Sequence, residues 1–164
     1  MAYLLDMNVF LSAKNLHFGM DFCPAFWDWV LESYKAGRVF SIDKVADEIE
    51  AGDDELSEWS KALPKGFYLE ASEQTVPALG ALSRWVTGRS YTPAAINTFL
   101  GVADYYLVAH ALAGGHVVVT HEVPADTINR VKIPNACLGV GVRCVSPFEM
   151  LRRERARFVL GHPG

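Results

Sequence analysis

The sequence lacks several features that would define a class of protein. Only three cysteines occur in 164 residues, with no CxxC pair, so neither a disulfide framework nor a thiolate zinc site is expected. No apolar run reaches the ~18 residues that span a bilayer, and the N-terminus has no basic region before its apolar stretch. We therefore expect no membrane segment, no signal peptide and a cytoplasmic location. No GxxxxGK[ST], GxGxxG or HExxH motif occurs, so those phosphate-binding and zinc sites have no support.

The formal net charge of −4 is unevenly distributed along the chain. Residues 43–58 contain eight acids and one lysine, whereas residues 152–157 contain four arginines and one glutamate. These segments contribute −7 and +3, so the rest of the chain is neutral. A negative total argues mildly against a nucleic-acid partner, but a neutral body weakens that argument. Any RNA contact is expected to lie away from residues 43–58.

Hydrophobic patterning predicts strands that alternate with helices. Short apolar runs predict strands at residues 3–5, 39–40, 67–69 and 117–120, with weaker candidates at 131 and 142–145. Apolar residues at helical spacing predict helices over residues 23–36, 41–52, 72–86, 92–100 and 102–113. Predicted helix N-caps are Asn8, Ser41 and Thr92. This alternation favours an α/β sandwich with a mostly parallel central sheet.

Four acidic residues stand where such a sheet would gather them. Asp6 follows the first strand and Glu122 follows the strand at 117–120, while Glu48 and Asp104 lie near helix starts. The carboxyl ends of parallel strands share one edge, and carboxylates converging there raise one another's pKa values. A hard divalent cation, Mg²⁺ or Mn²⁺, removes that repulsion and prefers oxygen ligands. The pattern therefore predicts a cation site that could activate water against a phosphodiester.

Each of the four acids lies in a short motif, and the motifs follow one another as Tyr3–Phe10, Ser41–Ile49, Val102–Ala111 and Val117–Glu122. In this order they resemble the motifs of the PIN-domain superfamily of metal-dependent ribonucleases, which includes the VapC-like toxins. Each alone is weak, but their order and spacing hold over about residues 3–150. The last resembles a PIN-like branch of uncharacterised bacterial proteins, because it reads Thr-x-Glu where Thr-x-Asp is commoner. That departure leaves open whether Glu122 binds a metal directly or through water.

The resemblance implies a PIN-like three-layer α/β/α domain over residues 1–151, followed by a basic tail at 152–164. It implies an Mg²⁺- or Mn²⁺-dependent endoribonuclease, the toxin of a type II toxin–antitoxin pair. RNA would be the substrate and an antitoxin protein the partner, with a homodimer as an allowed assembly. The catalytic and metal-binding residues would be Asp6, Glu48, Asp104 and Glu122, with Asn8 and Thr120 orienting them.

Each candidate residue also has a purely structural interpretation. Asp6 could cap the following helix, Asp104 could be an acid in the first turn of a helix, and Glu122 could form a salt bridge with Arg130 or Lys132. Asp47 competes with Glu48 for the same role. Two other functions stay open: a catalytically inactive PIN-like module that binds RNA or protein, and, more remotely, a haloacid-dehalogenase-like phosphatase. The phosphatase reading requires a second Asp where Asn8 stands.

Overall fold

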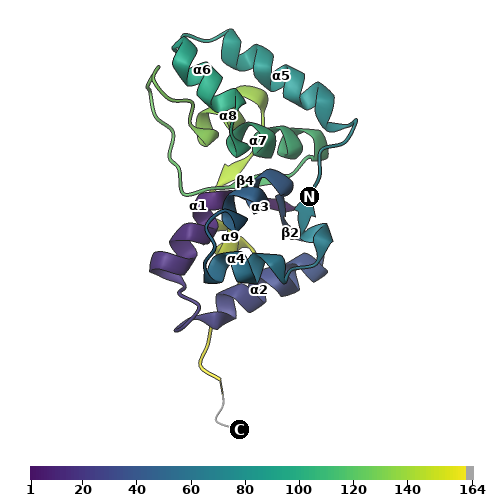
Figure 1. Ribbon diagram of the computed structural model, residues 1–164, viewed down its shortest axis with the longest axis vertical. Coiled ribbons are helices and arrows are strands. Elements are labelled where there is room, and N and C mark those ends of the chain that lie inside the picture. Colours follow the sequence, from purple (N-terminus) through teal and green to yellow (C-terminus); the bar gives the residue numbers. More distant parts are fainter. Residues whose placement is uncertain (162–164) are drawn as a thin grey trace.

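Five short strands form one all-parallel sheet at the centre of the computed structural model, which describes residues 1–161 (Figure 1). The strands are β1 (Tyr3–Leu5), β2 (Val39–Ile42), β3 (Tyr68–Leu69), β4 (Val117–Val119) and β5 (Cys144–Val145). Their order across the sheet is β3-β2-β1-β4-β5. In register, Leu5 of β1 pairs with Val119 of β4, and Val119 pairs with Val145 of β5. The α/β class with a parallel sheet is confirmed.

Helices cover both faces of this sheet, giving a three-layer α/β/α sandwich (Figure 1). One layer comprises α5 (Thr75–Thr87), α6 (Pro93–Leu100), α7 (Ala103–Gly114) and α8 (Ile133–Val140). The opposite layer includes α2 (Pro24–Lys35), α4 (Glu55–Lys61) and α9 (Pro147–Arg153). Directly after β1 and β2 begin α1 (Met7–Ser12) and α3 (Asp43–Glu50), while single turns of π-helix and 3₁₀-helix occur at Ala13–His17 and Lys65–Phe67. No helix within residues 1–161 combines the length and apolarity needed to cross a bilayer.

The two central strands are buried along their whole length. Every residue of β1 and of β4 is at most 3% exposed, as expected for parallel strands covered on both faces. Along the chain, β2 and β3 follow β1 and lie on one side of it, whereas β4 and β5 come later and lie on the other side. The strand order therefore reverses between β1 and β4. In open parallel sheets, ligands bind in the crevice beyond the carboxyl ends of the strands at such a point.

Two predicted helix caps are wrong, and in both cases a tertiary hydrogen bond uses the side chain instead. Asn8 is the second residue of α1, whose N-cap position belongs to Asp6. Ser41 lies inside β2, where its buried hydroxyl donates to the carbonyl of Leu5 at 2.7 Å. This bond ties the end of β1 to β2, and α3 begins two residues after Ser41.

Two other local predictions have opposite outcomes. Thr92 caps α6 as predicted, because its hydroxyl accepts a hydrogen bond from the Ala95 N–H at 3.1 Å. Val131 is not part of a strand: its side chain is 4% exposed, yet it belongs to the loop between β4 and α8. Burial of a single valine under a loop gives the same sequence signal as a short strand.

The start of the predicted basic tail is continuous with the last helix. Arg152 and Arg153 form the final turn of α9, and the chain beyond it returns to the body of the protein at Phe158. The Phe158 ring lies 5.7 Å from the ring of Phe18 and 6.2 Å from that of Phe26. The last part of the tail, residues 162–164, lies outside the described residues.

Candidate active site

Asp6 occupies the point at which the strand order reverses. It follows β1 directly, its backbone N–H donates to the Val119 carbonyl of β4 at 3.0 Å, and it is only 4% exposed. A carboxyl group buried to this degree is costly unless it is paired, protonated or bound to a cation. No salt bridge to Asp6 forms within residues 1–161.

A hydrogen-bond network at the end of β4 holds the Asp6 side chain. The Thr120 hydroxyl donates to Asp6 Oδ2 at 2.8 Å and accepts from the Glu122 N–H at 3.1 Å. Asn8 reaches the same group, since its Nδ2 donates to Thr120 Oγ1 at 3.3 Å while its Oδ1 accepts from the His121 N–H at 3.2 Å. The structure thus brings Asn8 and Thr120 together with Asp6 across 114 residues of sequence.

Electrostatics link Asp6 to the other predicted acids. Burial raises the pKa of Asp6 from its ordinary 3.8 to about 7, and the charges of Asp104 and Glu122 add to the effect, while the Thr120 hydroxyl opposes it. Burial, followed by the charge of Asp104, also raises the pKa values of Glu48 and Glu122. Asp104, in the first turn of α7, therefore repels all three other carboxylates. We call these four residues the carboxylate cluster.

Members of the cluster differ in their access to solvent. Asp104 is half-buried and burial raises its pKa, whereas Glu48 on α3 keeps an exposed side chain. Asp47, the rival of Glu48, is exposed and is not among the groups that raise the pKa of Asp6, Glu48 or Glu122. The acid that interacts with Asp104 from α3 is therefore Glu48.

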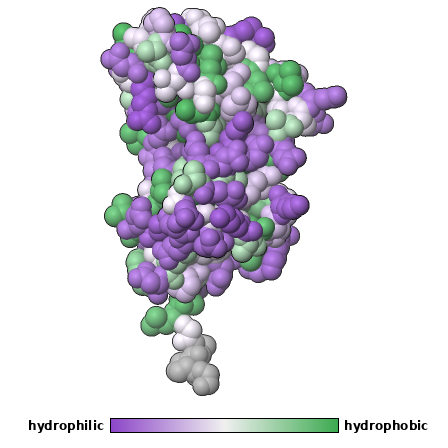
Figure 2. Space-filling model, viewed as in Figure 1, coloured by the Kyte–Doolittle hydropathy of each residue, from purple (hydrophilic) through white to green (hydrophobic). Residues whose placement is uncertain are grey.

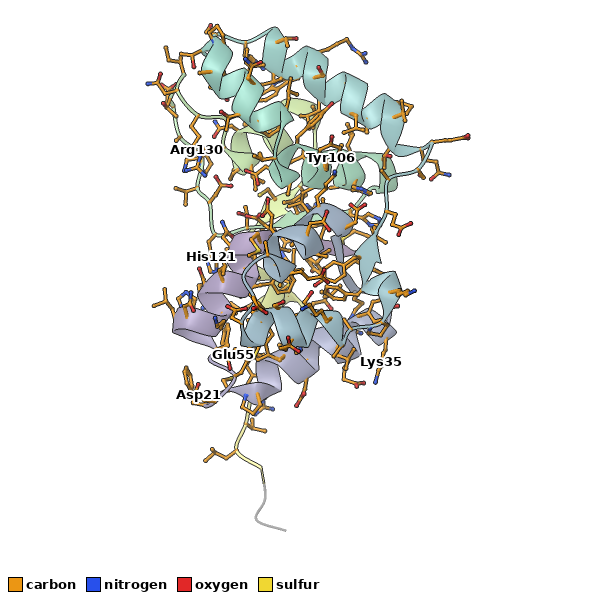
Figure 3. All side chains as sticks on the ribbon, viewed as in Figure 1. Asp21, Lys35, Glu55, Tyr106, His121 and Arg130 are labelled. Carbon is orange, nitrogen blue, oxygen red and sulfur yellow. The ribbon has the colours of Figure 1, made fainter. Side chains whose placement is uncertain are left out.

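Two cations lie on one side of the cluster. Arg130 Nη2 is 3.3 Å and Lys132 Nζ is 3.9 Å from Glu122 Oε1, so Glu122 does form the salt bridges that its structural interpretation predicts. The Arg130 guanidinium also opposes the rise in the pKa of Asp104. Figure 3 shows Arg130 on the loop that follows β4. Its side chain is 63% exposed, which leaves it free to contact a polyanion as well as Glu122.

A third cation lies on the α3 side. Lys44 Nζ lies 5.0 Å from the centre of the Tyr106 ring, over its face, and joins α3 to α7. Tyr106 is two residues beyond Asp104, and Lys44 is one helical turn before Glu48. Neither residue was singled out from the sequence, because the contact depends on how α3 and α7 pack.

The donor chemistry of the cluster fits a hard divalent cation. All four groups are carboxylates, the ligands that Mg²⁺ and Mn²⁺ prefer, and their mutual repulsion is relieved by positive charge. Within residues 1–161, no three His, Cys, Asp or Glu side chains form a group that could hold a metal ion as they stand. A cation held by three or more of Asp6, Glu48, Asp104 and Glu122 would therefore require their side chains to reorient.

The fold and the site together define an α/β/α protein with a carboxylate cluster at the reversal point of a parallel sheet. The chain matches a protein family described as a domain of unknown function (DUF4411) over residues 3–158, and it belongs to this family. No curated protein and no solved structure matches it. The description of this family names no activity.

Proposed function

We propose that the protein is an Mg²⁺- or Mn²⁺-dependent endoribonuclease that uses the carboxylate cluster. One observation carries the proposal: Asp6 is buried at the reversal point of the sheet with a pKa of about 7, and Asp104 and Glu122 repel its charge further. Perturbed carboxyl groups in a crevice are typical of catalytic sites. Such a group weakens the fold, which is expected where residues are kept for function.

The chain's own residues divide into ligands, orienting groups and contacts for RNA. Asp6 and Asp104 would hold the cation together with Glu48 and Glu122, and Thr120 fixes the Asp6 carboxylate through its hydroxyl. A bound divalent cation supplies a Lewis acid and lowers the pKa of a water molecule. A carboxylate of the cluster that does not bind the cation directly can act as a general base, and Glu48, which is exposed and whose pKa is raised, is the one best placed to accept a proton from water. Arg130 can neutralise a phosphate.

The motif resemblance alone supports a biological role, that of a toxin of a type II pair that acts in the cytoplasm and is restrained by a cognate antitoxin. Growth arrest on expression of the wild type, relieved by co-expression of a small protein encoded next to it, would support this role. Growth that is unaffected by the active enzyme would contradict it.

An RNA-cleavage assay on a matched pair of variants tests the enzymatic proposal. Glu48→Gln should lower Mn²⁺-dependent cleavage by roughly 10²-fold or more, in line with loss of a general base or ligand. The neighbouring variant Asp47→Asn makes the same change in charge on the same helix and should leave the rate within about twofold. Equal rates for the two variants would remove Glu48 from the mechanism.

A second candidate function is a catalytically inactive module that binds RNA or protein. It is supported by the salt bridges of Arg130 and Lys132 with Glu122, and by the finding that no three His, Cys, Asp or Glu side chains of residues 1–161 form a group that could hold a metal ion. The two candidates differ in cation binding. An active site should be stabilised by Mn²⁺ in a thermal unfolding assay, whereas an inactive module should show no shift.

A further inference from the structure

A cavity of about 380 Å³ opens beside the carboxylate cluster and shares one residue, Glu122, with it. Its walls come from the exit of β4 and from the end of β5 with the start of α9, and they include Thr120, His121, Glu122, Ser146, Phe148 and Glu149. The volume lies within the range of small-molecule pockets. Because Glu122 belongs to the cluster and the Thr120 hydroxyl donates to Asp6, an occupant of this cavity lies next to the proposed cation site.

Aromatic rings form one wall of the cavity. The rings of His121 and Phe148 lie 5.7 Å apart, and both contact His17 behind them, at 5.4 and 5.0 Å. His17 ends the single π-helical turn that follows α1. Three rings from three separate segments contact one another, and the rings of His121 and Phe148 are inclined by 66°, so a planar ligand can lie parallel to one of them with the other at its edge. Stacking on aromatic side chains is the usual way in which proteins bind unpaired nucleobases.

Two polar residues that flank Phe148 in the sequence, Ser146 and Glu149, also line the cavity. Glu149 forms an ion pair with Arg153 at 2.8 Å through Oε1, which leaves its other oxygen free to accept. Ser146 caps α9, because its Oγ accepts from the Glu149 N–H at 3.1 Å. A carboxylate is a poor neighbour for a phosphate but a good acceptor for the amino group of a base. Glu149 therefore favours a base over a phosphate as its neighbour in the cavity.

The geometry points to this cavity as a nucleobase subsite that selects bases with an exocyclic amino group, such as cytosine, over uracil. It rests on the proposed function for the placement of the phosphate at the carboxylate cluster. The base would stack on the Phe148 ring, beside the inclined ring of His121, and donate its amino group to Glu149. Uracil has a carbonyl oxygen at C4, where cytosine has its amino group, so it would face the Glu149 carboxylate with an acceptor. The cavity would thereby determine which phosphodiester is placed for cleavage.

Nucleoside binding to the full-length protein tests the subsite without relying on cleavage. Cytidine and uridine are titrated separately, and histidine ring signals are followed by NMR. Cytidine should shift the signals of His121 and bind roughly tenfold more tightly than uridine. Phe148→Leu keeps the apolar bulk and should weaken cytidine binding roughly tenfold, because the stacking surface is lost. The control Phe22→Leu makes the same change at a ring that is 68% exposed and outside the cavity, and it should bind as the wild type does.

Glu149→Gln tests the preference for an amino group. It replaces an acceptor by a group that can also donate, so the ratio of the affinities for cytidine and uridine should fall close to one. Glu32→Gln, which breaks the exposed pair of Glu32 with Lys35, is the matched control and should retain the preference. Equal binding of the two nucleosides by the wild type, or wild-type affinity in Phe148→Leu, would overturn the subsite.

Failure of the subsite and failure of the proposed function give different results. If the wild type cleaves RNA with Mn²⁺ and Phe148→Leu cleaves at the same sites, the proposed subsite is wrong but the ribonuclease activity is supported. If the wild type does not cleave RNA but binds cytidine through Phe148, the proposed activity is wrong but the base-binding site is supported.

Discussion

Asp6→Asn should stabilise the protein, and the gain should depend on pH. Burial makes the ionised form of Asp6 unfavourable in the folded state, so its pKa rises from 3.8 to about 7. A group whose pKa is raised on folding costs no stability below its unfolded pKa. The cost grows as the pH rises from about 4 to about 7 and is constant above that. Asparagine cannot ionise, so it never carries this cost.

The size of the effect follows from the two pKa values. Each unit corresponds to ~1.36 kcal/mol, so the interval between 3.8 and about 7 corresponds to an upper limit of roughly 4 kcal/mol in the free energy of unfolding. For a chain of this length, that is a rise of roughly 10 °C in the melting temperature. The Thr120 hydroxyl that donates to Asp6 Oδ2 can donate equally to the amide oxygen of asparagine, so the hydrogen bond is retained.

Urea unfolding in the presence of a chelator measures this difference at pH 4.5, 6, 7 and 8. The free energy of unfolding of Asp6→Asn should exceed that of the wild type by a small amount at pH 4.5. This difference should increase up to pH 7 or 8. Asp126→Asn, at an exposed position in the loop after β4, is the control and should show no such trend. If Asp6→Asn is less stable than the wild type at pH 8, or if the difference does not change with pH, then ionised Asp6 does not destabilise the folded state.

Three further predictions concern the same site. Mn²⁺ should raise the melting temperature of the wild type more at pH 8 than at pH 6, because binding must displace a proton from Asp6; equal shifts at both pH values would contradict this. Thr120→Val should weaken Mn²⁺ binding by roughly 10- to 100-fold in calorimetry, because it removes the hydroxyl that orients Asp6; an unchanged affinity would show that the hydroxyl is not needed. Arg130→Gln should change the free energy of unfolding by less than about 1 kcal/mol, because Arg130 is exposed in its pair with Glu122. It should also lower the slope of log affinity for RNA against log salt concentration by about one phosphate contact, and an unchanged slope would show that RNA does not contact Arg130.

The fold was predictable where the sequence signal is local and strong. Tyr3-Leu4-Leu5 and Val117-Val118-Val119 are continuous apolar runs, and both are central strands. Asp6 could be placed from the sequence because a carboxylate directly after a buried strand must lie at the carboxyl edge of a parallel sheet. Thr92-Pro93 begins a helix because both residues act within a single turn.

What could not be predicted depends on contacts between distant segments. Asn8 and Ser41 look like helix caps, yet the partner of Asn8 is Thr120, directly after β4, and the partner of Ser41 is the Leu5 carbonyl on β1. Local propensity is overridden there by a buried polar group that needs a partner. The aromatic wall of the cavity has the same origin, since His121 meets rings from two segments with no shared sequence pattern.

The acidic segment at 43–58 has two parts in the structure. Glu48 belongs to the carboxylate cluster, while Asp54 caps α4 and forms a salt bridge with Lys14. Figure 2 shows a largely hydrophilic surface on the face that carries α3 and α4 in Figure 1. Contacts with RNA are therefore expected on the side of Arg130 and the cavity, away from α4.

The most direct test of the account is the rate of RNA cleavage by the wild type and by Asp104→Asn, with Mn²⁺ and with a chelator. Asp104 repels each of the other three carboxylates, so it is the common member of the proposed site. If the carboxylate cluster is a cation-dependent active site, the wild type should cleave RNA only with Mn²⁺ or Mg²⁺. The rate should be lower by roughly 10²-fold or more in Asp104→Asn and should be unchanged in the exposed control Asp126→Asn. Cleavage that persists in the chelator, or that is equal in the wild type and Asp104→Asn, would contradict the proposed site.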